Sequence, residues 1–264
     1  MEVDWSAVDA LAHDAAGPDG VIGIAVFDAT GELFARHGER RFHSASTIKV
    51  PIMIEAYRQV EQGSLDLDSW YTLRDEDRIP GSGVLSHLHT GLELTVRDLV
   101  TLMIAISDNT ATNLVLDRVG LAAVNATMQS LGMRDSILGR PMLGRLPSEG
   151  EPENWSTPRD LARCVQAIVA GEAANAQSCA RMKETLAQQS ESRRISRFLV
   201  EGAGISWGTK PGGLPGVHND VGYVTSPRGT LSMAILCENL PDLDFAERTI
   251  GEIARLSLVT TGLL

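Results

Sequence analysis

Lysine is scarce in this sequence of 264 residues. Only three of the 23 basic residues are lysines, at positions 49, 183 and 210, and the other 20 are arginines. Arginine does not give up its proton inside a protein, whereas a buried lysine can do so. Each lysine is therefore a candidate for chemistry that needs an amine. Lys183, on an expected surface helix, is the weakest candidate of the three.

Positive charge is also short overall. The sequence has 23 basic and 34 acidic residues, so its net charge is −11. This charge argues against a surface that binds nucleic acid and against a polybasic membrane patch. No apolar run has the length of a transmembrane helix, and the acidic start Met1–Trp5 lacks the apolar segment of a signal peptide. We expect a cytoplasmic protein, unless the chain was trimmed, that acts on a small molecule. The oligomeric state stays open.

Cysteine and histidine provide no sign of a metal or redox centre. The three cysteines are odd in number and widely spaced, which excludes a disulfide framework and a CxxC motif. The six histidines are scattered, and the pair His87 and His89 alone is a weak metal signal. The sequence therefore predicts no metal and no cofactor.

The order of apolar patterns predicts an α/β (α+β) fold. Strand-like segments lie near both chain ends, and a block of helices lies between them. We expect one domain, 1–264, with an antiparallel sheet lobe from 1–43 plus 190–264 and an inserted all-helical lobe from 44–189. The expected helices are 4–16, 46–62, 95–106, 110–119, 122–131, 156–171, 174–189 and 242–258, and the expected strands are 21–28, 33–43, 205–209, 221–225 and 231–237.

Residues 133–156 are predicted to form one long loop, rich in Gly, Pro, Arg and Glu. A loop of this length inside a compact domain usually has a function.

The first candidate motif is Ser46-Thr47-Ile48-Lys49. If Ser46 opens a helix, the i and i+3 positions share a face, so the hydroxyl and the amine can meet. Apolar neighbours would disfavour the charged lysine, which could then accept the serine proton and make Ser46 a nucleophile. The spacing alone is weak, because about one such match per chain of this size occurs by chance.

The second motif, Ser107-Asp108-Asn109, lies between an apolar helix and the next helix. Its residues could simply cap the two helices. They could also serve catalysis, with Ser107 relaying a proton to a leaving group and the Asn109 amide orienting the amine or the substrate.

The third motif, Lys210-Pro211-Gly212-Gly213, lies at the end of an expected strand. Lys210 could supply a fixed positive charge, the glycines would let a substrate approach the backbone, and an N–H there could donate to an oxyanion. A plain strand-ending turn is the alternative.

In this order and spacing the three motifs resemble the active-serine β-lactamase and penicillin-binding-protein superfamily, and class A enzymes in particular. The resemblance extends over roughly residues 20–260, and includes the surroundings of Phe42–Val50 and Asp220-Val221-Gly222. It implies that Ser46 is the nucleophile, Lys49 its general base and Ser107 the proton relay. It further implies that the substrate is bound by Asn109, Lys210, Gly212 and Gly213, and that the N–H groups of Ser46 and Gly213 form the oxyanion hole.

Two positions depart from class A enzymes. They have Lys-Thr-Gly as the third motif, whereas Pro211 provides neither a hydroxyl nor an N–H. Their long loop carries Glu-x-x-x-Asn, and the glutamate activates the deacylating water. Counted from Leu131-Gly132, those positions fall near Met142 and Leu146, which cannot act as a base or hold a water.

Three glutamates follow later in the loop, Glu149, Glu151 and Glu153, with Asn154 beside the last. We expect them to form a solvated acidic loop, and the alternative is that one of them replaces the missing base.

The sequence thus predicts a serine hydrolase of the class A type that forms an acyl-enzyme through Ser46. Its substrate would be a β-lactam, turned over slowly, or a related amide or ester. A D-amino-acid peptidase or esterase on the same scaffold is one alternative, and a non-catalytic β-lactam- or peptide-binding module is the other.

The scarcity of lysine generates a first prediction. Lys49→Arg should slow acylation of Ser46 by at least about 10²-fold, because a guanidinium cannot accept the serine proton. Intact-mass spectrometry during incubation with a chromogenic cephalosporin measures the rate, and Lys183→Arg is the matched control. If Lys49→Arg acylates at the wild-type rate, the reaction does not need an amine at position 49.

Overall fold

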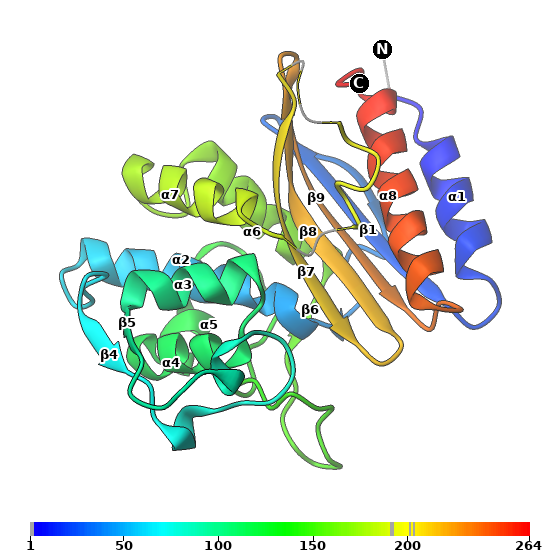
Figure 1. The fold of residues 1–264 in the computed structure, drawn as a ribbon. Coiled ribbons are helices and arrows are strands. Elements are labelled where there is room, and N and C mark those ends of the chain that lie inside the picture. Colours follow the sequence, from blue (N-terminus) through cyan, green and yellow to red (C-terminus); the bar gives the residue numbers. More distant parts are fainter. Residues whose placement is uncertain (1–2, 191–192, 201, 203) are drawn as a thin grey trace.

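The computed structural model describes residues 3–190, 193–200, 202 and 204–264, and has a mixed α/β fold (Figure 1). The helices are α1 (Ser6–Ala16), α2 (Lys49–Glu61), α3 (Val96–Ala105), α4 (Asn109–Val119), α5 (Leu121–Ser130), α6 (Pro158–Ala170), α7 (Ala176–Ala187) and α8 (Leu243–Thr260). The strands are β1 (Val21–Asp28), β2 (Gly31–Arg36), β3 (Phe42–His43), β4 (Trp70–Thr72), β5 (Glu93–Thr95), β6 (Trp155–Ser156), β7 (Ser206–Leu214), β8 (Val217–Ser226) and β9 (Gly229–Glu238).

The main sheet is antiparallel with the strand order β2-β1-β9-β8-β7. Strands from the two chain ends therefore lie side by side, as the sequence predicts.

Helices cover both faces of this sheet. On one face α1 and α8 lie together, and their apolar sides form a core with β1 and β9 (Figure 1). On the other face α6 packs against β1 and β9, and also contacts α2 and α7. The second and larger core, which includes α2 to α5, continues from this side. No helix among the described residues is long and apolar enough to cross a bilayer.

The returning strand of the first hairpin is shorter than predicted. β2 ends at Arg36, because His37 adopts a left-handed backbone conformation (φ 47°) and a turn follows in which the Arg40 N–H donates to the His37 carbonyl. Phe42 and His43 form the separate strand β3, which pairs with β6. The prediction of one strand over 33–43 is therefore wrong in its second half.

The strand before the third motif is longer than predicted. β7 continues through Lys210, Pro211 and Gly212 to Leu214, so the motif lies within a strand and does not end one. Pro211 is tolerated because β7 is an edge strand, where a missing N–H that faces away from β8 breaks no ladder bond. This places the motif along the free edge of the sheet.

Candidate active site

Ser46 lies in a short 3-10 turn, Ala45–Ile48, that leads directly into α2. Ala45 begins the turn with φ 47°, and Ser44 anchors it, because its N–H donates to the Asn154 carbonyl at 2.9 Å. The turn holds Ser46 in the wall of a cavity of about 410 Å³, which Asn109 and Gly213 also line. The other residues around this cavity are Ala45, Gly81, Ser82, Arg140, Met142, Leu143, Gly144, Arg145, Leu146, Glu153, Asn154, Leu214 and Pro215.

Lys49 lies at the start of α2 and is fully buried. Its Nζ donates to the Ser107 carbonyl at 2.6 Å, to Ser107 Oγ at 3.1 Å and to Asn109 Oδ1 at 2.9 Å. The first and second motifs, far apart in sequence, are thus joined at one amine. Burial opposes a charge on this nitrogen, while three oxygen acceptors favour it.

Ser107 occupies the tight turn between α3 and α4. Its φ of 57° lies in the left-handed region, a conformation that costs free energy for a residue other than glycine. Strain of this kind persists where neighbouring contacts fix the chain, and the bonds from Lys49 do so here. The turn presents the Ser107 hydroxyl to the amine.

Asp108 is the N-cap of α4, which accounts for the capping interpretation of the second motif. Its Oδ1 accepts from the Ala111 N–H at 2.8 Å, and its Oδ2 accepts from the N–H groups of Val84 and Leu85 at 2.7 and 2.8 Å. Asn109 Nδ2 donates to the Pro80 carbonyl at 3.0 Å. These bonds fasten the segment 80–85 beside the cavity, so the motif has a structural task as well as its proposed chemical one.

The third motif is mostly buried within β7. Lys210 is fully buried, and its Nζ donates to the Pro211 carbonyl at 2.8 Å. Of the predicted site residues, Ser46 is half-buried and Gly213 is exposed to the cavity. The others are buried, namely Lys49, Ser107, Asn109, Lys210 and Gly212.

The two glycines of this motif have different surroundings. A Cβ on Gly212 would lie 2.9 Å from the Ser46 nitrogen and 3.0 Å from both the Ser44 oxygen and the Thr47 nitrogen. A Cβ on Gly213 would have its nearest neighbour, Arg194 Nη2, at 3.6 Å. Gly212 therefore lets the serine turn pack on the strand, whereas we expected it to make room for a substrate.

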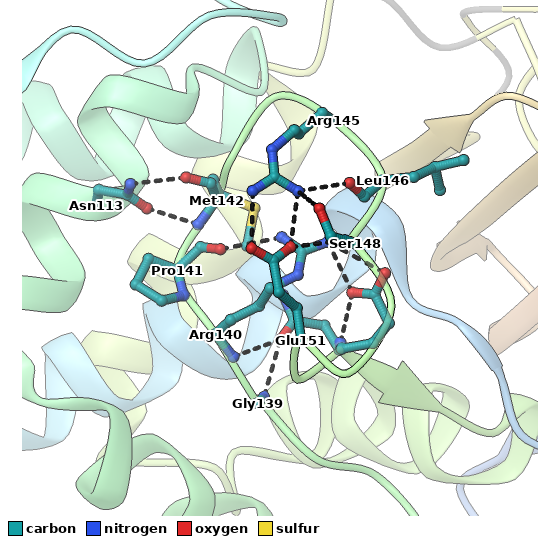
Figure 2. A network of polar contacts seen from close by, with 11 residues as sticks. Asn113, Gly139, Arg140, Pro141, Met142, Arg145, Leu146, Ser148 and Glu151 are labelled. Carbon is teal, nitrogen blue, oxygen red and sulfur yellow. Dashed lines mark hydrogen bonds and ion pairs between the residues drawn. The ribbon is translucent and has the colours of Figure 1, made fainter.

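Met142 lies where the sequence comparison expects a glutamate. Its N–H donates to Asn113 Oδ1 at 2.8 Å, and its carbonyl accepts from Asn113 Nδ2 at 2.9 Å (Figure 2). These two hydrogen bonds fix the loop to α4 and hold Met142 in the cavity wall. Leu146, four residues on, is 41% exposed.

The three loop glutamates divide into two kinds. Glu149 and Glu151 are exposed, as expected of a solvated acidic loop. Glu151 pairs with Arg145 at 2.7 Å, and this hydrogen bond together with the Ser148 N–H lowers the pKa of Glu151 to about 2 (Figure 2). The pair is therefore intact at neutral pH and is lost only as the pH falls toward that value.

Glu153 contradicts the solvated-loop expectation. Its side chain is 7% exposed and forms an ion pair of 2.9 Å with Arg140. Its Oε1 also accepts from the Asn154 N–H at 2.6 Å. Although Glu153 lines the cavity, its carboxylate is thus already engaged by a guanidinium and a backbone donor.

Sequence reasoning missed the residues that close the base of the loop. Asn154 Oδ1 accepts from the N–H groups of Gly139 and Arg140 at 2.8 and 3.0 Å, which ties the two ends of the loop together. The sequence offers a signal for this closure, an Arg near the start of the loop and a Glu-Asn pair near its end, whereas from the sequence we interpret only the glutamate, as a possible base.

Comparisons with known proteins agree on one family. The sequence model of the Beta-lactamase enzyme family matches residues 5–260. β-Lactamase L2 of Stenotrophomonas maltophilia is 34% identical over 157 residues, 58% of this chain and 51% of that protein. The chain thus spans about half the length of the first curated relatives that it matches.

Solved structures align over nearly the whole chain. The β-lactamase of Sphaerobacter thermophilus is 52% identical, with a TM-score of 0.96, and the match covers 99% of this chain and 98% of that one. PBP-A is 25% identical, with a TM-score of 0.86 over 97% of this chain and 96% of its own. Another similar structure is that of a PBP-A mutant as an acyl-enzyme complex with penicillin G.

The packing at the two glycines generates a prediction. Gly212→Ala should destabilise the protein by about 1–3 kcal/mol and slow acylation, because its methyl group would push the Ser46 turn away from β7. Gly213→Ala is the matched control, since its methyl group meets only ordinary contacts, and it should unfold at nearly the wild-type temperature. Thermal unfolding of both variants measures the difference, and equal stability would contradict the packing argument.

Proposed function

Since the chain belongs to the Beta-lactamase enzyme family, we propose that it is a β-lactamase-type serine hydrolase that forms an acyl-enzyme through Ser46. The observation that carries the proposal is the buried Lys49 amine, bonded to Ser107 and Asn109 one helical turn after a serine that lines the cavity. The small cavity fits a low-molecular-weight amide, and we propose a β-lactam as the substrate.

The proposed acylation uses the residues of the three motifs. The neutral Lys49 amine accepts the Ser46 proton, and Oγ attacks the carbonyl carbon, while the N–H groups of Ser46 and Gly213 donate to the oxyanion. As the C–N bond breaks, Ser107 gives its proton to the leaving nitrogen and regains one from Lys49, whose Nζ lies 3.1 Å from Ser107 Oγ. Charge and protons balance at each step.

Two further residues act around this reaction. Asn109 orients Lys49 through Oδ1, 2.9 Å from Nζ. Lys210 contributes positive charge to an anionic substrate from a buried position, without a hydroxyl from the next residue, Pro211.

Deacylation is the slow step of the proposed reaction. Met142 cannot activate a water, and the Glu153 carboxylate is held by Arg140 and the Asn154 N–H. Removal of a positioned general base typically costs 10²–10⁴ in rate, so the acyl-enzyme should accumulate during turnover.

One experiment separates this proposal from its alternatives. The protein and a Ser46→Ala variant are incubated with a chromogenic cephalosporin, with intact mass and turnover recorded together. We expect a long-lived adduct that Ser46→Ala lacks. Neither adduct nor turnover, also with simple esters, would favour a non-catalytic binding module. Turnover of D-amino-acid esters or peptides without a cephalosporin adduct would favour the peptidase or esterase alternative.

The missing base generates a prediction of its own. Met142→Glu should accelerate deacylation by about 10²-fold, because it returns a carboxylate to a backbone position that Asn113 already fixes. Met142→Gln is the control, with similar size and polarity but no basic oxygen. Adduct decay after removal of free cephalosporin gives the rate. Equal decay in the two variants would exclude a base role for this position.

A further inference from the structure

Arg194 is a buried arginine whose side chain contacts β7 and β8, and it belongs to none of the three sequence motifs. It is 8% exposed, and its Nη1 donates to the carbonyl oxygens of Gly212 at 2.7 Å and Asn219 at 2.5 Å. Gly212 and Asn219 are paired across β7 and β8. One guanidinium nitrogen therefore joins the two strands at the level of the predicted oxyanion hole.

The bond to Gly212 fixes the direction of the next N–H. The carbonyl of Gly212 and the N–H of Gly213 belong to one peptide unit, and in a trans peptide they point in opposite directions. Because Arg194 bonds the Gly212 oxygen together with an oxygen of β8, this carbonyl points into the sheet. The N–H of Gly213 then points out from the free edge of β7, on the side where Gly213 lines the cavity.

The bonds from Arg194 add to the pairing of this peptide with β8. The peptide joins two glycines, the residues with the greatest backbone freedom, and no further strand among the described residues lies beside β7. A charged donor on the carbonyl also polarises the peptide, which strengthens the opposite N–H as a donor.

We propose that Arg194 is a positioning residue of the oxyanion hole, which orients and polarises the Gly212–Gly213 peptide so that the Gly213 N–H can donate to the substrate carbonyl. The proposal rests on the proposed function, because it assigns a support to one of that reaction's donors.

The test compares two variants of Arg194 with a neighbouring arginine. Arg194→Ala should slow acylation of Ser46 by on the order of 10- to 100-fold with little change in the non-covalent affinity for cephalosporin, since the lost interaction acts on the transition state. Arg194→Lys, which keeps a charged donor, should recover part of the rate. Arg197→Ala is the matched control, because Arg197 lies in the same segment and shares the partner Glu247 with Arg194.

Infrared spectroscopy distinguishes a positioning role of Arg194 from a purely structural one. The stretching frequency of the ¹³C-labelled acyl carbonyl reports hydrogen bonding in the oxyanion hole. It should rise in the Arg194→Ala acyl-enzyme and stay at the wild-type value in Arg197→Ala. This measurement uses the adduct itself, so it holds even if Arg194→Ala is less stable.

The outcomes separate this proposal from the proposed function. If Arg194→Ala acylates at the wild-type rate, or its carbonyl frequency is unchanged, the positioning role is overturned and the proposed hydrolase stands. If the wild-type protein forms no Ser46 adduct, the proposed function fails first and this proposal falls with it.

Discussion

The site depends on one buried nitrogen. Lys49 joins α2 to the turn between α3 and α4, because its Nζ donates to the carbonyl and hydroxyl oxygens of Ser107 and to Asn109 Oδ1. Three oxygen acceptors favour an ammonium, whereas complete burial favours the neutral amine. The proposed reaction uses that balance, because the nitrogen must take a proton from one hydroxyl and return it to another. The strained backbone of Ser107 and the cap by Asp108 keep those oxygens at fixed distances from it.

In the long loop, Met142 is held by contacts that do not depend on its side chain. Asn113 bonds both the N–H and the carbonyl of Met142, a contact that is indifferent to the side chain. Asn154 holds the two ends of the loop together in the same way, through backbone N–H groups. Replacing the Met142 side chain should therefore change the chemistry of the site more than the shape of the loop, whereas replacing Asn154 should change the shape.

Much of the fold could be predicted from the sequence, because its signals are local. Apolar runs such as Val21–Asp28 and the N-cap Thr95 of α3 are read directly from residue type. The meeting of Lys49 with Ser107 followed only from the resemblance to a known family. The continuation of β7 through Pro211 could not be predicted, since glycine and proline indicate a turn unless the strand is known to be an edge. The contacts of Arg194 could not be predicted for a similar reason, because they exist only once β7 pairs with β8.

The free edge of β7 has a consequence for the kind of molecule that can bind. An edge strand offers unpaired backbone groups to any extended chain, which is a hazard for self-association. Pro211 interrupts this row of donors, and the Ser46 turn packs on the strand at the next residue, Gly212. Among the described residues of β7, Gly213 and Leu214 line the cavity, followed by Pro215. We therefore expect this edge to suit a ligand with a single peptide-like amide better than a long β-strand of another protein.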